Sequence, residues 1–348
     1  MDRRGWLFTG AGLMAVGAGV VGAGAATIGA SLVRQALRSV AGADDGPDDL
    51  LATPTALSST STVIADDGTR LNVVSYGPED AAGDVIVAIH GWTCNTSYWN
   101  PQINRFASQR RVIAYDQRGH GGSELGATRP TIETLGLDLN AVLDAMVPAG
   151  RKAVLIGHSM GGMTIMSWAA QYPHKVDERI SAVVLASTAA DALIANQLLL
   201  PVDLPRYSKP FAPTMLRMLI SAPLPVPRTA YGPRFTQYLT LGPAARPSHV
   251  AFVDEMVMSC PPRVRGLWGA AMTKLDVGAG LAALTVPTTV VVGADDRLTP
   301  PSHANRIAEV LRNNGNLADL VVYDGVGHMS TIETAGEFNE LLEKVLAG

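Results

Sequence analysis

The sequence predicts an α/β protein in which parallel strands are buried between helices. Residues 84–89, Asp-Val-Ile-Val-Ala-Ile, form a nearly continuous apolar run, which is typical of a strand covered on both faces. Similar runs alternate along the chain with segments of helical periodicity. The run at 154–156 leads into Gly157-His158-Ser159-Met160-Gly161 and then a helical pattern, which is the strand–turn–helix order of a nucleophile elbow.

A hairpin opens the predicted domain. Residues 61–65 and 70–76 alternate between apolar and polar side chains, and Asp66-Asp67-Gly68 lies between them. An Asp-Gly pair in this position indicates a β-hairpin. Strands and helices then follow in turn: a strand at 84–89, a helix near 102–109, a strand at 111–115, a helix at 131–146 capped by Thr131, the strand at 154–156 with a helix from Met160 to the Tyr172-Pro173 break, and a strand at 180–185.

The alternation of strands and helices stops between residues 191 and 275. Prolines cluster in this stretch, and short helical pieces carry several methionines. We expect a helical insertion, or cap, that lies over the sheet. The alternation then returns with a strand at 288–292, a helix at 302–312, a strand at 320–323 and a helix at 335–346.

The N-terminus carries a long apolar segment. Residues 5–33 contain no charged side chain and are long enough to cross a bilayer as a helix. Three interpretations stay open: an uncleaved transmembrane anchor, a cleaved export signal and a buried core helix. Arg3-Arg4-Gly5-Trp6-Leu7 is similar to a twin-arginine export motif, and Ala41-Gly42-Ala43 is similar to a signal-peptidase site. We expect a protein that is anchored in the cell membrane or exported, in an orientation that the flanking arginines leave open.

The composition excludes a nucleic-acid partner. The net charge is -4, and no run is rich in lysine or arginine. Cys94 and Cys260 lack the spacing of a metal-binding pair, and they are compatible with one disulfide or with two separate thiols. We divide the chain into an N-terminal hydrophobic segment (1–43), a linker (44–59), the first part of the α/β core (60–190), the helical cap (191–275) and the second part of the core (276–348).

The candidate catalytic residues follow predicted strands. A serine hydroxyl is a poor nucleophile at neutral pH and needs an adjacent base, which in turn needs an orienting acid. After Ser159 in the elbow, Asp295 and Asp296 follow the strand at 288–292, and His328 follows the strand at 320–323. The order Ser, Asp, His is that of α/β-hydrolases and differs from the orders of chymotrypsin and subtilisin.

With these motifs the chain resembles the α/β-hydrolase superfamily, in its serine esterase or lipase-like branch with a helical cap, over about residues 60–348. The family's Gly-x-x-Asp-x-x-x-Pro acid loop matches Gly293 to Pro300 and selects Asp296 over Asp295. Gly327-His328 matches the histidine loop, His90-Gly91 the oxyanion loop, and 116–121 the Asp-x-Arg-Gly-x-Gly turn. The resemblance implies a mostly parallel eight-stranded sheet with residues 191–275 as the cap.

The resemblance also implies a role for each site residue. Ser159 attacks an acyl carbonyl, His328 moves the proton, and Asp296 orients the imidazole. The backbone N–H groups of Trp92 and Met160 hold the oxyanion. This chemistry needs no metal and no organic cofactor.

Nearby polar residues have structural interpretations. We expect His90, His158, Arg118 and His120 to brace loops or pack, and Cys94 not to act as a nucleophile.

The first hypothesis for function is a serine hydrolase that cleaves small-molecule carboxylic esters through an acyl-enzyme. A cap rich in Leu, Met and Pro favours an apolar or lipid ester. The alternatives are a cofactor-free perhydrolase or haloperoxidase-like enzyme, an aminopeptidase-like enzyme that uses Asp254 or Glu255, and a non-catalytic protein that binds a small ligand. The natural substrate, the acyl-chain length and the oligomeric state stay open.

Overall fold

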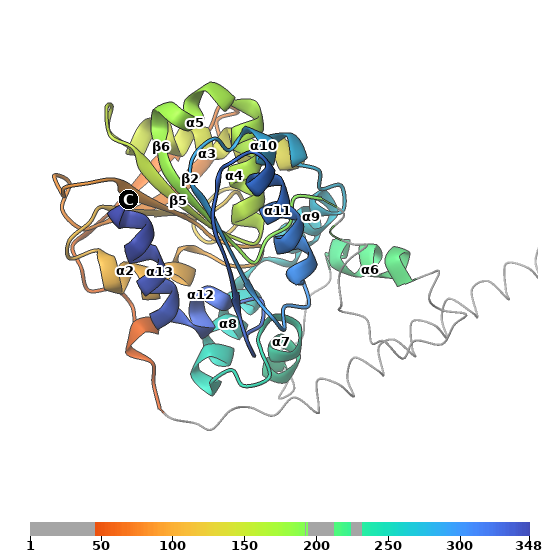
Figure 1. Cartoon of the computed structure of the whole chain (residues 1–348). Coiled ribbons are helices and arrows are strands. Elements are labelled where there is room, and N and C mark those ends of the chain that lie inside the picture. Colours follow the sequence, from red (N-terminus) through yellow and green to blue (C-terminus); the bar gives the residue numbers. More distant parts are fainter. Residues whose placement is uncertain (1–45, 192, 194–211, 224–231) are drawn as a thin grey trace, which may run out of the picture.

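A single eight-stranded sheet organises the described part of the chain (Figure 1). The computed structural model describes residues 46–191, 193, 212–223 and 232–348. The strand order is β1-β2-β4-β3-β5-β6-β7-β8. The strands are β1 Ser58–Ile64, β2 Arg70–Tyr76, β3 Val85–Ile89, β4 Val112–Tyr115, β5 Ala153–His158, β6 Ile180–Ala186, β7 Thr288–Gly293 and β8 Leu317–Tyr323. The predicted α/β-hydrolase fold with a mostly parallel eight-stranded sheet is confirmed.

The direction of the strands places several chain segments at one edge of the sheet. β1 and β2 form the predicted antiparallel hairpin, and β2 also runs antiparallel to β4. All other neighbours, from β4 and β3 through β8, are parallel. The loops that follow β3, β5, β7 and β8 therefore meet at the carboxyl edge, where ligands bind in open α/β sheets.

Helices cover both faces of the sheet (Figure 1). One face carries α3, α4, α5, α10 and α11, and the other carries α2, α12 and α13. The bounds of these helices are α2 Asn100–Phe106, α3 Ile132–Met146, α4 Met160–Gln171, α5 Pro173–Arg179, α10 Gly278–Ala283, α11 Pro301–Asn313, α12 Ser330–Glu333 and α13 Ala335–Ala347; a short 3-10 helix, η2, spans Thr96–Trp99. The predicted Thr131 cap is present: its side chain accepts from Thr134 N and forms a capping box.

Two hydrophobic cores explain why the central strands have no polar alternation. In β3, Val85, Val87 and Ile89 belong to the core beneath α3 and α4, whereas Ile86 and Ala88 belong to the core beneath α2 and α13. All five residues are fully buried. Since both faces of the strand meet apolar helices, each position is apolar.

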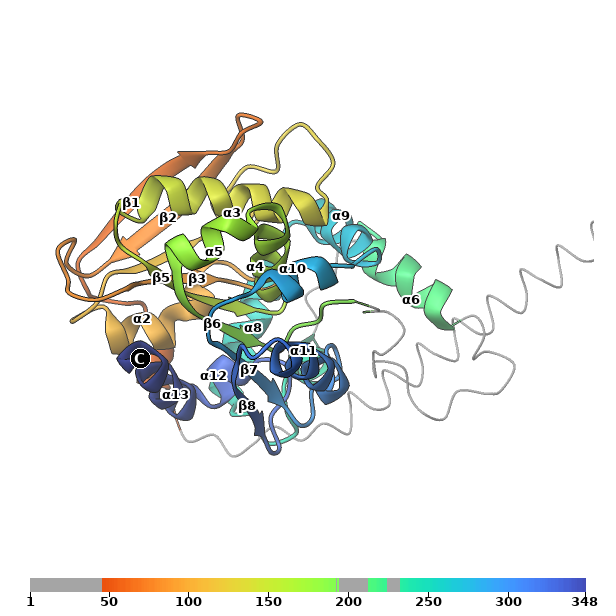
Figure 2. The ribbon, with the colours of Figure 1, turned by 45° about the horizontal axis from the view of Figure 1, so that its top comes forward.

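The described part of the predicted cap is helical. It contains α6 Ala212–Ser221, α7 Gly232–Thr240, α8 Pro247–Ser259 and α9 Pro262–Met272. Figure 2 shows α6 and α9 side by side beyond the end of α4. Two tryptophans join α9 to the core: Trp268 Nε1 donates to Arg118 O at 2.8 Å, and Trp92 Nε1 donates to Arg265 O at 3.1 Å.

The chain enters the described region along α2 and α8. A 3-10 helix, η1, spans Asp49–Leu51, within the stretch predicted as a linker. Leu51 is buried and its carbonyl accepts from Asn100 Nδ2 at 3.0 Å, while Asp48 Oδ2 lies 2.8 Å from an Arg246 guanidinium nitrogen. β1 also begins at Ser58, three residues before the predicted start, because backbone pairing with β2 continues through an exposed polar stretch.

The apolar segment at residues 5–33 and the candidate cleavage site at 41–43 lie outside the described residues. In the part of the chain that the structure describes, no helix combines the length and the hydropathy needed to cross a bilayer.

Candidate active site

The predicted nucleophile elbow is a single-residue turn held by the neighbouring strand. β5 ends at His158 and α4 begins at Met160, so Ser159 alone makes the turn. Its φ of 52° lies in the left-handed region, which is uncommon for a residue with a side chain. Ser159 N donates to Ala186 O at 2.9 Å, and Ser159 O accepts from Thr188 Oγ1 at 2.6 Å. These bonds stabilise a conformation that is unfavourable by itself.

The predicted oxyanion loop after β3 approaches the elbow too closely for Gly91 to carry a side chain. A Cβ atom on Gly91 would lie 2.6 Å from His158 Nδ1 and 3.2 Å from Ser159 Cβ. A Cβ atom on Gly157 would likewise lie 2.7 Å from the carbonyl carbon of Gly161. Glycine at these positions therefore allows the loop, the strand end and the first turn of α4 to pack together.

Asp296 and His328 form a buried hydrogen-bonded pair at the same edge of the sheet as the elbow. They follow β7 and β8, which are neighbouring parallel strands. Asp296 Oδ2 lies 2.8 Å from His328 Nδ1, and the residues are 1% and 4% exposed. Thr299 fixes the carboxylate: its N donates to Oδ1 at 2.8 Å and its Oγ1 donates to Oδ2 at 2.9 Å. Because a carboxylate only accepts, Nδ1 carries the proton of the neutral imidazole and Nε2 is able to accept one.

His158 connects the elbow to the histidine loop. His158 Nε2 lies 3.0 Å from His328 O, and the two ring centroids are 4.8 Å apart. Ser159, the next residue, is thereby placed close to the histidine loop. Ser159 Oγ and His328 Nε2 are not hydrogen-bonded in this structure. The distance between a nucleophile and its base is often too long for a hydrogen bond before a substrate binds.

The two predicted oxyanion donors lie on separate chain segments at the same sheet edge. Trp92 lies in the loop after β3, and Met160 is the first residue of α4. The first N–H groups of a helix have no acceptor within that helix, so Met160 N faces out of its end. The Trp92 indole, by contrast, bonds to α9, which ties the oxyanion loop to the cap.

Three buried histidines brace these loops as neutral rings. Burial lowers the pKa of His90 to about 4 and that of His120 to about 3, and it lowers the pKa of His158 well below its usual value. His90 Nε2 accepts from Gln117 N at 2.9 Å, and His120 Nε2 accepts from Thr93 N at 3.2 Å. Their hydrogen bonds support the expected structural roles.

Arg118 and the cysteines are also structural. Arg118 forms ion pairs of 2.6 Å with Asp67 and with Asp138, which brace the loop as expected. Cys94 and Cys260 are free and buried. Burial raises the pKa of Cys94 to about 12, so it stays a thiol at neutral pH and is a poor nucleophile. Among the described residues no group of three or more His, Cys, Asp or Glu side chains is placed to hold a metal ion.

Sequence reasoning missed two polar side chains near the site, Glu333 and Gln117. Glu333 Oε2 accepts from Gly242 N at 2.7 Å, and Oε1 accepts from Gly327 N at 3.0 Å. Burial raises the pKa of Glu333 to about 7, although these N–H groups lower it. The available signal was that Glu333 is the one charged residue between positions 329 and 336. Gln117 gave no signal, since it occupies a variable position of the Asp-x-Arg-Gly-x-Gly turn.

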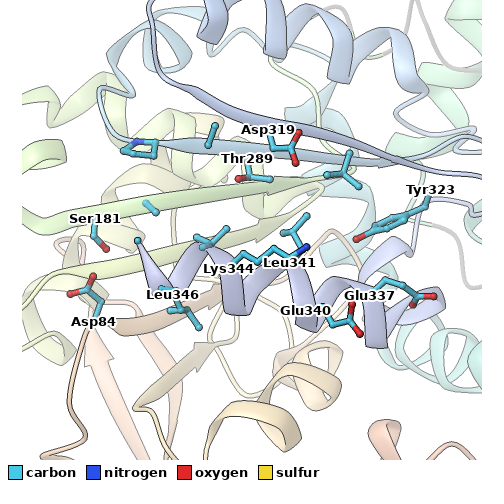
Figure 3. Close-up of a pocket in the computed structure, with 17 residues that line it drawn as sticks. Asp84, Ser181, Thr289, Asp319, Tyr323, Glu337, Glu340, Leu341, Lys344 and Leu346 are labelled. Carbon is cyan, nitrogen blue, oxygen red and sulfur yellow. The ribbon is translucent and has the colours of Figure 1, made fainter.

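A groove of about 710 Å³ lies between α13 and the sheet, away from these residues (Figure 3). Asp84 and Ser181 line one end of it, and Tyr323 and Glu337 line the other. Asp84 and Ser181 lie at the amino ends of β3 and β6, opposite the carboxyl edge that carries the elbow. None of the predicted site residues lines the groove.

Comparisons with known proteins identify the family of this fold. A model of the alpha/beta hydrolase fold matches residues 84–335. A non-heme chloroperoxidase from Streptomyces lividans is 29% identical over 276 residues, which are 77% of this chain and 92% of the relative. The 3-oxoadipate enol-lactonase 2 of Acinetobacter baylyi is 27% identical over 288 residues, which are 79% and 92% of the two chains. The structure of a thermophilic esterase from Thermogutta terrifontis is similar with a TM-score of 0.63 at 22% identity, over 83% of this chain and 99% of the esterase. The matched family segment spans well over half of the sequence, and the chain belongs to the α/β-hydrolase fold family.

Proposed function

We propose that the protein is a serine hydrolase that cleaves carboxylic esters through an acyl-enzyme on Ser159. The observation that carries this proposal is the buried Asp296–His328 pair, which leaves His328 Nε2 able to accept a proton next to the elbow. A hydrolase is supported by the family and by the named activities of its relatives. Enol-lactones and esters share the acyl–oxygen bond that this site would break.

The residues have the following roles. Ser159 Oγ attacks the acyl carbon, and His328 Nε2 takes the serine proton. The N–H groups of Trp92 and Met160 hold the oxyanion, with a loss of about 3–4 kcal/mol expected for each donor removed. The protonated His328, stabilised by Asp296, passes its proton to the leaving alcohol. Water, deprotonated by the same imidazole, then attacks the acyl-enzyme, and the acid is released as Ser159 recovers its proton.

The substrate class rests on the cap and on the N-terminus. The cap sequence is rich in Leu, Met and Pro, which favours an apolar acyl or alcohol group. Asp254, a candidate partner for a substrate amine, accepts a hydrogen bond from Thr236 at 2.5 Å within the cap. We also propose that residues 5–33 anchor the protein in the cell membrane or export it, because of their length and lack of charge.

A perhydrolase is the second candidate, favoured by the similarity to a non-heme chloroperoxidase. In that reaction hydrogen peroxide replaces water as the acceptor of the acyl group, and the product is a peracid. The two reactions share the acyl-enzyme. They are distinguished by the ratio of peracid to acid that forms when peroxide and water compete for it.

The test is turnover of a panel of p-nitrophenyl esters of increasing chain length, with an enol-lactone and an aminoacyl anilide added. We expect hydrolysis of short or medium esters by the wild type, and a loss of at least about 10³-fold in Ser159→Ala. Ser97→Ala, which removes an exposed hydroxyl from η2, is the matched control and keeps full activity. Absence of turnover on every ester would overturn the proposal. Cleavage of the anilide alone would favour the aminopeptidase-like alternative, and binding without turnover would favour the ligand-binding one.

To test the N-terminal proposal, membranes are washed with alkaline carbonate, and the mass of the mature chain is measured. An intact chain that stays in the membrane supports an anchor, and a chain shortened near residue 43 supports export. A full-length chain in the soluble fraction contradicts both.

A further inference from the structure

The two predicted oxyanion donors come from different segments, a loop and the first turn of a helix, so their separation must be fixed by contacts between those segments. Trp92 belongs to the loop after β3, whereas Met160 begins the helix after β5. An oxyanion hole stabilises a transition state only if its donors are held in place before the reaction begins. The residue that links the two segments therefore matters to the rate.

Gln117 contacts the oxyanion loop through both its backbone and its side chain. Gln117 N donates to His90 Nε2 at 2.9 Å, and Gln117 Nε2 donates to His90 O. The His90 carbonyl lies two residues before Trp92. The Gln117 residue is 1% exposed, so water does not compete for these bonds.

The other end of the same amide contacts the first turn of the elbow helix. Thr164 Oγ1 lies 2.6 Å from Gln117 Oε1 and 2.8 Å from Met160 O, and its proton is shared between these two acceptors. Thr164 is fully buried. These two contacts also fix the orientation of the Gln117 amide. His90 O only accepts, so the amide nitrogen faces it and the amide oxygen faces the Thr164 hydroxyl. A continuous chain of hydrogen bonds thus runs from His90 through Gln117 and Thr164 to Met160.

We propose that Gln117, with Thr164, is a positioning residue that sets the separation of the oxyanion donors on Trp92 and Met160. This inference rests on the proposed function, since it concerns the same site. Gln117 touches neither the nucleophile nor the reacting atoms. Its effect belongs to the transition state and should change kcat rather than KM.

The test compares variants that break this chain of bonds at different points. Gln117→Met keeps the length of the side chain and removes both amide contacts. Thr164→Val removes the hydroxyl and keeps the shape of the side chain, whereas Thr164→Ser keeps the hydroxyl and removes the methyl group. Ser167→Ala is the matched control, because Ser167 lies one turn later on α4 and its Oγ donates to Ile132 O at 2.8 Å, away from the oxyanion loop. kcat and KM are measured with p-nitrophenyl butyrate, together with urea unfolding.

We expect kcat to fall about 10- to 100-fold in Gln117→Met and in Thr164→Val, with KM changed less than about threefold, because complete loss of one donor costs about 10²–10³-fold. Affinity for butylboronic acid, which forms a tetrahedral adduct on the serine, should fall in parallel, while affinity for butyrate should not. Thr164→Ser should keep kcat within about threefold. The double variant should lose little more than either single variant, since both break one chain.

The inference is overturned if kcat stays at the wild-type value in both variants, or if Ser167→Ala lowers kcat as much as they do. It is also overturned if KM rises while kcat is kept. These outcomes require a wild type that turns over the ester. An inactive wild type with intact fold refutes the proposed function instead, so the two failures are distinguishable.

Discussion

Replacing Asp296 by asparagine tests the tautomer that the structure imposes on His328. Oδ1 of Asp296 accepts from Leu298 N at 2.9 Å and from Thr299 N at 2.8 Å, so an asparagine oxygen will take this position. The amide nitrogen then faces His328 Nδ1, where the carboxylate oxygen lies 2.8 Å away in the wild type. Because the new group donates, Nδ1 must become the acceptor and the ring proton moves to Nε2. A protonated Nε2 cannot take the proton of Ser159.

The expected effect is a fall in kcat of about 10⁴-fold, which corresponds to about 5 kcal/mol of transition-state stabilisation. KM should change little, because Asp296 does not reach the substrate. The assay is steady-state hydrolysis of a p-nitrophenyl ester, with circular dichroism to check the fold. Asp295→Asn is the control, since Asp295 is the adjacent acid and the carboxylate bonded to His328 Nδ1 is that of Asp296; this variant should keep wild-type activity. The reasoning is refuted if Asp296→Asn stays within tenfold of the wild type, and the acid is wrongly identified if Asp295→Asn is the inactive variant.

Two further predictions concern stability. Burial raises the pKa of Glu333 from 4.5 to about 7, so the stability that the protonated carboxyl contributes is full below about pH 4.5 and is lost as the pH rises through 7. The free energy of unfolding of Glu333→Gln, minus that of the wild type, should therefore rise by on the order of 1–3 kcal/mol between about pH 4.5 and pH 8 in urea unfolding. A difference between the two proteins that is independent of pH would contradict this. Trp268→Phe removes the bond from Nε1 to Arg118 O and should lower the free energy of unfolding by about 1–3 kcal/mol more than Trp99→Phe, because Trp99 Nε1 is buried without a hydrogen-bond partner in the described structure. Equal losses in the two tryptophan variants would show that the bond between α9 and the core contributes nothing.

Local sequence patterns predict the parts of the fold that depend on neighbouring residues. The elbow is one example, since an apolar strand, two glycines and a helix are all encoded within a few positions of Ser159. For the acid, the resemblance of Gly293 to Pro300 to the family's acid loop selected Asp296, which the structure places within hydrogen-bond distance of His328. The start of β1 was missed because pairing with β2, not side-chain alternation, extends an exposed edge strand back to Ser58.

Long-range polar contacts were beyond prediction from the sequence. Gln117 bonds to Thr164 across 47 positions, and Glu333 bonds to Gly242 across 91 positions. Neither partner carries a pattern that points to the other, because a hydrogen bond of this kind depends on how loops converge after the sheet has formed. The tautomer of His328 was beyond prediction for the same reason. The proton is placed on Nδ1 only because the loops after β7 and β8 bring Asp296 to that atom.

The central claim is that Ser159 is an activated nucleophile. The most direct measurement is the intact mass of the purified protein after reaction with a small fluorophosphonate, followed by peptide mapping. We predict a single adduct on Ser159 in the wild type, no adduct in Ser159→Ala, and a rate reduced by at least about 10²-fold in Asp296→Asn. An adduct on another residue, or folded wild type that hydrolyses esters and yet forms no adduct on Ser159, would contradict the account.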